Sequence, residues 1–193
     1  FTDLKLYQLY NVKRHLPHYV DGFTPSVRKI LFGIMKKFRT SNVRCKVFQL
    51  AAYIAQHMQY HHGDMSINGI IIRLAQSYIG GREFPPLRAL SNFGTRKNGG
   101  DDAGQPRYIY TKSNNRFVDN AYPALDNPIL EYVYEDGEMV EPKHMAPILP
   151  FSILESYKSP GTGWAITMWA RDYFVVSNHA KACIRSNSIL PYA

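Results

Sequence analysis

Apolar residues recur every three to four positions over most of residues 4–80, a pattern typical of amphipathic helices. Thr24-Pro25 indicates a helix start, because a Thr hydroxyl caps the first turn and Pro is favoured at the first helical position. Four helices are predicted, from Leu4 to near Pro17, from Pro25 onward, from Val47 to His57, and from Ser66 to Gly80-Gly81. The second helix is expected to keep its basic residues largely outside the apolar stripe, namely Arg28, Lys29, Lys36 and Lys37.

The pattern changes after Gly81 to short alternating segments separated by Pro and Gly, which predicts strands and turns. Asp136-Gly137 divides two alternating runs within 130–140 and predicts a β-hairpin. Residues 108–111 are strand-prone, and the basic loop 92–100 is expected to form a wing beside a helix-turn-helix made by the third and fourth helices. Residues 164–193 have no clear period and receive no element. Helices followed by short strands predict an α+β fold class.

The composition predicts a globular protein with a packed core. The chain has 193 residues, of which 45% are hydrophobic and 20% charged, and no apolar run is long enough to span a membrane. Because the chain starts with Phe1 and has no basic-then-apolar leader, we expect a segment of a longer protein. Two cysteines, Cys45 and Cys183, cannot form a disulfide framework or a complete zinc site, which favours a reducing compartment.

The charge is unevenly distributed along the chain. The formal net charge is +8, and residues 11–46 alone hold nine basic side chains against the single acid Asp21. Residues 117–143 reverse the sign, with seven acids against Lys143. A basic face of this kind is typical of nucleic-acid binding, because neutralising phosphates releases counterions.

Two groups of residues could carry chemistry. His57 and His61 have the i, i+4 spacing of metal ligands on a helix, but the pattern fixes no third ligand, so no metal site is predicted. Arg107 precedes Tyr108, and a guanidinium beside a phenol can hold a phosphate and favour loss of the phenolic proton. Covalent attack by tyrosine on a phosphodiester needs this arrangement. The residues alone do not choose Tyr108 over Tyr110.

Five ordered motifs over residues 14–164 resemble the breakage–reunion core of type IIA DNA topoisomerases, in the eukaryotic style. Thr24 stands where that family usually has Lys, and Pro160 stands where it usually has an Ile that wedges between bases. These departures resemble a divergent viral branch of the family. The motifs are 17–33 around Asp21-Gly22-Phe23, Tyr60-His61-His62-Gly63, 93–111 ending in Arg107-Tyr108-Ile109-Tyr110-Thr111, Val140-Glu141-Pro142 with 147–150, and Gly161-Thr162-Gly163-Trp164.

The resemblance implies a winged-helix domain over 1–146 and the start of an α/β tower domain over 147–193. It makes Tyr108 the nucleophile that becomes joined to the 5′ phosphate of cut DNA, with Arg107 holding the scissile phosphate and His62 assisting at the transition state. The other implied roles are Arg14 and Arg28 lining the catalytic site, Asp21 orienting these arginines, Lys36, Arg96 and Lys97 contacting the DNA backbone, and Pro160 acting as a DNA wedge.

The implied activity is that of an ATP-dependent homodimeric isomerase that passes one DNA duplex through a transient double-strand break in another, changing supercoiling and linkage. Mg²⁺ at a TOPRIM domain and ATP at an ATPase domain lie outside these residues, so no cofactor is expected within them. The TOPRIM domain of the partner subunit would serve each tyrosine. Such a protein is expected inside the cell, in the host cytoplasm if viral and in the nucleus if cellular, with a role in DNA replication. The competing interpretation is a non-enzymatic winged-helix DNA-binding module, which forms no covalent adduct with DNA.

Overall fold

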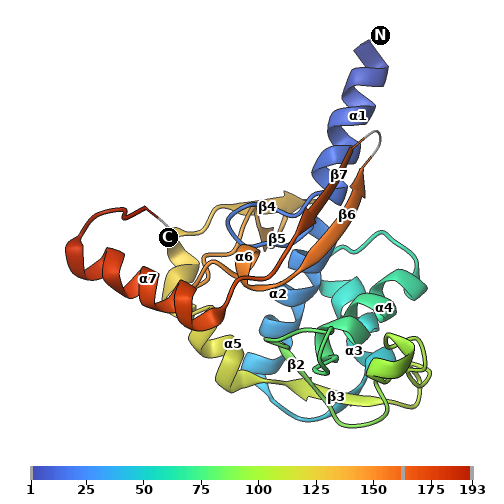
Figure 1. Cartoon of the computed structure of the whole chain (residues 1–193). Coiled ribbons are helices and arrows are strands. Elements are labelled where there is room, and N and C mark those ends of the chain that lie inside the picture. The colour runs from blue at the N-terminus through green and yellow to red at the C-terminus, as the bar shows by residue number, and fades with distance from the viewer. Residues whose placement is uncertain (1, 162–163, 192–193) are drawn as a thin grey trace. The chain divides into compact units, whose positions relative to one another are not determined.

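The computed structural model describes residues 2–161 and 164–191, and the chain divides into two compact units (Figure 1). The larger unit is Ser26–Met145, and the smaller one combines Phe1–Pro25 with Ala146–Ala193. Both mix helices with small antiparallel sheets, which confirms the α+β class. Residues 1–25 therefore group with the C-terminal segment, and the assignment of winged-helix and tower domains stays a prediction.

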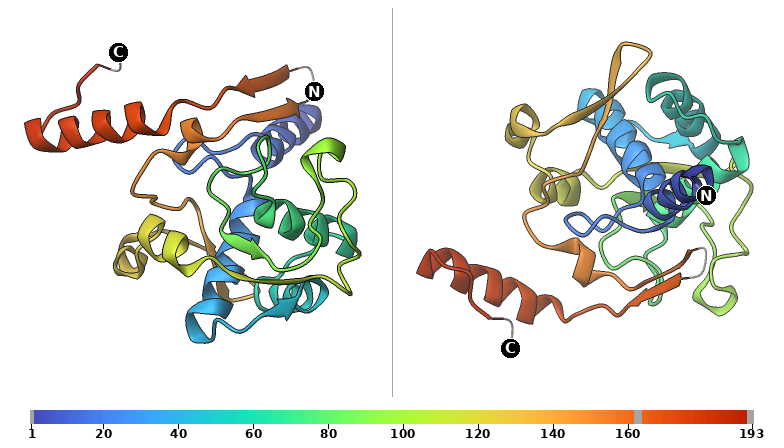
Figure 2. Two further views of the ribbon diagram at one scale, coloured as in Figure 1. Left: turned by 60° about the horizontal axis from the view of Figure 1, so that its bottom comes forward. Right: turned by 90° about the horizontal axis from the view of Figure 1, so that it is seen from above.

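Three helices build the core of the larger unit, and Figure 2 shows them from two further sides. They are α2 (Pro25–Thr40), α3 (Val47–His57) and α4 (Asp64–Ala75). The predicted start of α2 and both ends of α3 are confirmed. The three helices contribute side chains at most 1% exposed, among them Ile30, Ile34, Phe38, Leu50, Ile54, Ile67 and Ile71. Burial of these apolar groups, each contributing about 1.5–3 kcal/mol, fixes the helices that carry the candidate site.

A three-stranded antiparallel sheet in the order β1-β3-β2 covers the end of this helical core. Its strands are β1 (Cys45–Lys46), β2 (Leu87–Ala89) and β3 (Tyr110–Ser113). In the central strand, Tyr110 lies opposite Lys46 and Thr111 opposite Ala89. The long connection from β2 to β3 contains the short 3-10 helix η1 (Arg96–Asn98). Because β3 begins at Tyr110, Tyr108 lies in the loop before the strand, not within it.

The rest of the larger unit confirms the predicted hairpin. It comprises α5 (Asn115–Ala121), the 3-10 helix η2 (Ala124–Ile129), β4 (Tyr132–Glu135) and β5 (Glu138–Pro142). Between β4 and β5, Asp136 and Gly137 have φ values of +51° and +81°. Two consecutive positive φ angles give the turn that matches the twist of the flanking strands.

The smaller unit holds a helix, a hairpin and a second long helix. Its elements are α1 (Thr2–His15), α6 (Phe151–Leu154), β6 (Tyr157–Gly161), β7 (Trp164–Met168) and α7 (Tyr173–Ser186). α1 lies beside β6 (Figure 1). The carboxylate of Asp172 accepts a 3.0 Å hydrogen bond from the Val175 N–H and caps α7. No helix among the described residues is long and apolar enough to cross a membrane.

The expected exposure of two basic residues in α2 is wrong. Arg28 and Lys29 are only 5% and 8% exposed. Lys29 is tolerated inside because its ammonium group pairs with the carboxylates of Glu135 and Glu141 on the β4–β5 hairpin. The count of basic residues in 11–46 therefore overstates the charge available to an external partner.

The expected length of the fourth helix is also wrong, since α4 ends at Ala75 and not at Gly80-Gly81. Gln76 leaves the helical conformation, and its Nε2 donates to the carbonyl oxygens of Phe93 and Gly100 at 2.9 and 3.2 Å. These long-range hydrogen bonds stabilise the break in the helix and tie its end to the basic loop.

Candidate functional site

The loop that carries Arg107 and Tyr108 is held by the N-terminus of α3. The backbone N–H of Val47 donates to Ile109 O at 3.0 Å, and that of Phe48 donates to Pro106 O at 3.1 Å. The first N–H groups of a helix have no partner within the helix, so the loop carbonyls satisfy donors that would otherwise need solvent. The Tyr108 N–H also donates to Gln105 O at 2.9 Å. The loop is therefore fixed by backbone bonds on both sides of Tyr108.

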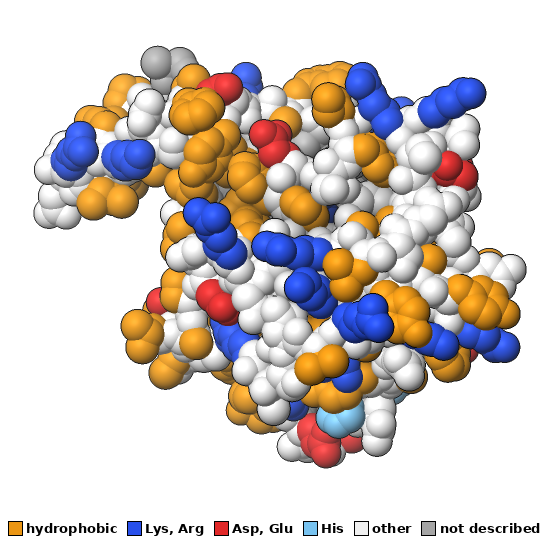
Figure 3. Space-filling view, turned by 90° about the horizontal axis from the view of Figure 1, so that it is seen from below, with side chains coloured by type: hydrophobic (Ala, Val, Ile, Leu, Met, Phe, Trp, Pro, Cys, Tyr) orange, Lys and Arg blue, Asp and Glu red, His pale blue; other side chains and the backbone are white. Residues whose placement is uncertain are grey.

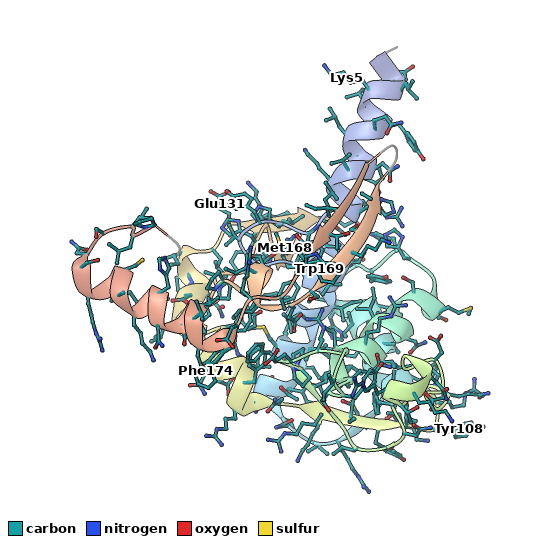
Figure 4. All side chains as sticks on the ribbon, viewed as in Figure 1. Lys5, Tyr108, Glu131, Met168, Trp169 and Phe174 are labelled. Atoms are coloured by element: carbon teal, nitrogen blue, oxygen red, sulfur yellow. The ribbon has the colours of Figure 1, made fainter. Side chains whose placement is uncertain are left out.

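Tyr108 points outward from this fixed loop (Figure 4), and it is 67% exposed. The guanidinium carbon of Arg107 lies 5.8 Å from the centre of the Phe48 ring, a cation–π contact that restricts the arginine beside the phenol. Both side chains line an open groove of about 400 Å³. The residues lining it are Phe48, Asn68, Gln105, Pro106, Arg107 and Tyr108.

Asn68 brings α4 into this groove and was missed by the sequence analysis. Its Oδ1 atom is buried and has no hydrogen-bond partner among the described residues. An unsatisfied amide oxygen is unusual in a folded protein. The sequence alone did not single out Asn68, because a polar residue on a helix with an apolar period looks like any solvated side chain.

Tyr110 has a different environment from Tyr108. It is half-buried at the start of β3, and its backbone N–H donates to Ser91 Oγ at 3.0 Å. Arg44 and Lys46 lie over its ring, at 5.3 and 5.8 Å from the ring centre. Tyr110 therefore lies in the sheet with two cations near its ring, and it is not among the residues that line the groove.

His62 lies in the joint between α3 and α4, just before α4 begins, and it is exposed. Its ring meets Tyr60 edge-on, with the ring centres 5.4 Å apart. The Tyr60 hydroxyl lies 3.1 Å from Ser66 Oγ, so this tyrosine links the joint to the first turn of α4. His62 is in the same unit as Tyr108 but is not among the groove-lining residues.

The other two histidines of this region have protein partners. His57 Nδ1 lies 2.9 Å from Tyr53 O and its ring stacks on Tyr53, whereas His61 Nε2 lies 3.4 Å from Glu135 Oε2. In the described part of the chain, no group of three or more His, Cys, Asp or Glu side chains could hold a metal ion.

Asp102 closes the basic loop through hydrogen bonds to Thr95. Asp102 accepts hydrogen bonds from the Thr95 N–H at 2.7 Å and the Thr95 hydroxyl at 2.8 Å. These bonds, the backbone one first, lower the pKa of Asp102 below its usual value of 3.8. The closure keeps Arg96 and Lys97 exposed on η1.

Gly94 and Gly100 allow close packing within and around the basic loop. Gly94 has a φ of +88°, and a Cβ built there would lie 2.5 Å from Gly100 O. Gly100 also has a φ of +88°, and its Cβ would lie 2.3 Å from both Gln76 Nε2 and the Tyr78 hydroxyl. Any side chain at either position would strain the backbone; at Gly94 it would also collide with the backbone of Gly100, and at Gly100 it would displace the side chains of Gln76 and Tyr78.

The remaining predicted residues are divided between the units. In the larger unit, Arg28 is buried in α2, whereas Lys36 on the same helix is exposed. In the smaller unit, Arg14 is exposed near the end of α1, and the fully buried Asp21 accepts a 3.0 Å hydrogen bond from the Phe23 N–H. Arg14 and Asp21 are thus not in the unit that holds Tyr108.

Pro160 lies in β6, where its backbone is opposite Ala165 of β7. The side chain of Pro160 lies outside the described side chains, so the proposed wedge stays a prediction.

Lysine and arginine side chains lie among hydrophobic ones over the middle of the face shown in Figure 3. On the larger unit, the exposed cations of the predicted DNA contacts come from three elements. They are Lys36 on α2, Arg96 and Lys97 on η1, and Arg107 in the tyrosine loop. This mixture of charge and apolar surface is compatible with a partner that offers phosphates and flat bases.

Comparison with known proteins identifies the family. A family model for the A subunit of DNA gyrase/topoisomerase IV matches residues 14–192. DNA topoisomerase 2 of African swine fever virus (isolate Pig/Kenya/KEN-50/1950) is 42% identical over 188 residues, which is 97% of this chain and 16% of the relative. DNA topoisomerase 2 of Plasmodium falciparum (isolate K1 / Thailand) is 36% identical over 192 residues, 98% of this chain and 13% of the relative.

A solved structure agrees with these sequence matches. The DNA-binding, cleavage and re-ligation domain of Plasmodium falciparum topoisomerase II superposes with a TM-score of 0.89 at 34% identity, covering 98% of this chain and 25% of that one. The chain thus spans a small part of the relatives that it matches. The resemblance drawn from the ordered motifs is confirmed, and the chain belongs to the family of the DNA gyrase/topoisomerase IV A subunits.

Proposed function

We propose that this chain forms the DNA-breaking part of an ATP-dependent type II DNA topoisomerase. The observation that carries the proposal is the exposed Tyr108 beside Arg107, on a loop fixed by α3, in a chain of this family. The Tyr108 oxygen attacks a DNA phosphorus, the new O–P bond forms, and the bond to the 3′ oxygen breaks. The phenolic proton is lost and the leaving 3′ oxygen gains one, so the reaction is balanced and reversible.

Tyr108 is favoured over Tyr110 by accessibility. A nucleophile must reach the phosphorus, and Tyr108 is 67% exposed at the edge of an open groove. Tyr110 is anchored in the central strand, with two cations over its ring. Arg107 then binds the scissile phosphate and stabilises the charge that develops on it.

The other residues have supporting roles in the proposal. His62 accepts the phenolic proton or donates a hydrogen bond to a non-bridging oxygen. Arg28 joins the anion site, and the exposed side chains of Lys36, Arg96 and Lys97 contact the DNA backbone. Because Arg28 is only 5% exposed, it can contact only a phosphate that approaches the small exposed part of its side chain. The roles that the family resemblance implies for Arg14 and Asp21, which belong to the other unit, stay predictions.

Duplex passage needs parts that these residues do not supply. Among the described residues, no group of three or more His, Cys, Asp or Glu side chains could hold a metal ion. We place the Mg²⁺ site in a TOPRIM domain, the ATP site in an ATPase domain, and the complete enzyme in a homodimer where each tyrosine meets the partner's TOPRIM domain. Its place of action is the nucleus, or the host cytoplasm for a viral protein.

The test is Tyr108→Phe in the full-length enzyme, with Tyr110→Phe as the matched control. Loss of one hydroxyl removes the nucleophile but little of the basic surface, so covalent adducts trapped by denaturant should disappear while DNA affinity is kept. Tyr110→Phe should retain adduct formation. Adducts that persist in Tyr108→Phe would move the reaction to another residue, and a protein that binds DNA but never forms adducts would be a binding module.

A further inference from the structure

Lys29 is the centre of a partly buried cluster of charged residues in the larger unit. Its Nζ donates to Glu135 Oε1 at 2.7 Å and lies 3.4 Å from Glu141 Oε2. The same Nζ donates to the backbone carbonyl of Gln59 at 3.4 Å. A buried ammonium group needs such partners, because an unpaired charge in the interior is strongly destabilising. Lys29 therefore ties α2 to the β4–β5 hairpin and to the joint between α3 and α4.

Glu135 connects this cluster to a histidine. One carboxylate oxygen binds Lys29, and the other, Oε2, lies 3.4 Å from His61 Nε2. Oε2 is buried and accepts no hydrogen bond from the described residues. Leaving a carboxylate oxygen buried without a donor is costly, and the Nε2–H tautomer of His61, 3.4 Å away, would supply the missing donor. Glu135 thus bridges a lysine and a histidine from two other elements.

Lys29 and Glu135 contact Gln59 and His61, which lie on either side of Tyr60 in the joint between α3 and α4 that leads to His62. Gln59 has a φ of +46°, a conformation that is unfavourable for a residue other than Gly and needs support from its surroundings. Lys29 holds the carbonyl of Gln59, and Glu135 contacts the ring of His61. His62 follows directly, so its backbone direction is set by these contacts and by Tyr60.

We propose that Glu135 is a positioning residue for the cleavage reaction: it fixes His61 and, through Lys29, Gln59, and so orients His62 toward the phosphate. This inference rests on the proposed role of His62. The hairpin then supports the reaction from a distance, without touching DNA.

Because Glu141 also pairs with Lys29, Glu135 can be replaced without leaving Lys29 unpaired. In Glu135→Gln, Lys29 still has Glu141 as an ionic partner, and the amide keeps the size of the side chain. The fold is retained while the bridge to His61 is weakened. Glu131→Gln is the matched control, because Glu131 also pairs with a lysine at 2.7 Å, Lys143, but on the exposed surface and away from the joint.

The experiment measures cleavage rate at saturating DNA and DNA affinity in the full-length enzyme. For Glu135→Gln the rate should fall roughly 10- to 100-fold, because about 1 Å of misplacement can cost about 10²-fold, while affinity stays the same. Glu131→Gln should change neither. In the double variant with His61→Gln the loss should not exceed that of Glu135→Gln alone, because His61→Gln removes only a contact that Glu135→Gln already weakens.

A readout independent of activity follows His62 itself. Modification of histidines by diethyl pyrocarbonate, mapped by mass spectrometry, should become faster at His62 in Glu135→Gln relative to His57, whose ring stays on Tyr53. Equal cleavage rates and equal His62 modification in the Glu135→Gln variant and the parent would overturn the positioning role. If the parent forms no adduct, the proposed function fails, and the modification rates alone still decide whether Glu135 orients His62.

Discussion

Asp102 is an acidic residue that stabilises the basic loop, whose proposed contacts with DNA depend on positive charge. Its carboxylate accepts two hydrogen bonds from Thr95, and these bonds keep the exposed Arg96 and Lys97 on a defined turn. Asp102 lowers the positive charge of the loop that carries Arg96 and Lys97. Its contribution is therefore the two hydrogen bonds that it accepts, and not its charge. A single side chain thereby holds the turn that presents Arg96 and Lys97, the two proposed DNA contacts.

Asp102→Asn is therefore expected to loosen the loop in a pH-dependent way. The folded pKa lies below the usual value of 3.8, so the stabilisation is present above that value and is lost as the pH falls through the folded pKa. Hydrogen exchange at the Thr95 N–H should be faster in Asp102→Asn at about pH 6, and the difference from the parent should shrink as the pH falls through the folded pKa of Asp102. Asp101→Asn, at the adjacent exposed position, is the control. A difference between Asp102→Asn and the parent that did not depend on pH would contradict this account.

The β6–β7 hairpin is the element that carries the predicted wedge. Pro160 is in β6, one position before the end of the strand, with its backbone opposite Ala165. Its place in a strand pair differs from the isolated Ser-Pro-Gly turn that the local sequence suggests. A hairpin end is a suitable carrier for an apolar side chain that enters between base pairs, because the paired strands resist the insertion force.

Pro160→Gly should reduce DNA bending and cleavage without unfolding the protein. Proteins that kink DNA use apolar side chains to open a base step, and a rigid proline loses little entropy on insertion. Fluorescence transfer across an end-labelled duplex measures the bend, and thermal unfolding provides the control. A normal bend in a folded variant would remove the wedge, and lower thermal stability with a normal bend would assign Pro160 to the hairpin alone.

At the scale of the whole molecule, the exposed positive charge is smaller than the sequence count suggests. Lys29 is buried against two carboxylates, and Arg28 is 5% exposed. The surface cations suited to DNA are those on separate elements of the larger unit, such as Lys36 and Arg96. Binding by such separate charges depends on salt, because each phosphate contact releases counterions.

Replacing both Lys36 and Arg96 by Glu should weaken DNA binding and flatten its salt dependence. The slope of log affinity against log salt should become shallower by about 0.9 for each phosphate that the protein no longer neutralises. Lys143→Glu serves as the control, because Lys143 is already paired with Glu131 in the acidic part of the chain. A slope that is the same in the double variant and in Lys143→Glu would place the DNA face elsewhere.

Local features were predictable and distant pairings were not. The N-terminal signal at Thr24-Pro25, the apolar period of α3 and the Asp136-Gly137 turn are all encoded by neighbouring residues, and all three elements form where expected. The pairing of Lys29 with Glu135 joins residues 106 positions apart, so no local pattern contains it. α7 was missed for another reason. The helical spacing of Val176, Ala180 and Cys183 is present in the sequence but was not recognised, and only Val176 and Ser177 of this helix are buried.

The candidate site divides in the same way. The Arg107-Tyr108 pair stands out in the sequence by its chemistry, whereas the choice of Tyr108 over Tyr110 and the role of His62 came from the resemblance of local motifs to the family. The groove that joins Asn68 to Tyr108, and the support of the joint by Glu135, depend on the packing of helices against loops. Periodicity describes one element at a time and gives no information on which elements meet.

The backbone bonds between α3 and the tyrosine loop have a consequence for how such a protein can evolve. Val47 and Phe48 hold the loop through their N–H groups, and Ile109 and Pro106 accept through carbonyls, so the hold does not depend on which side chains stand there. Of the common amino acids, only proline at the donor positions would remove a bond. A lineage can therefore alter the side chains that line the groove while the hydroxyl of Tyr108 keeps its place.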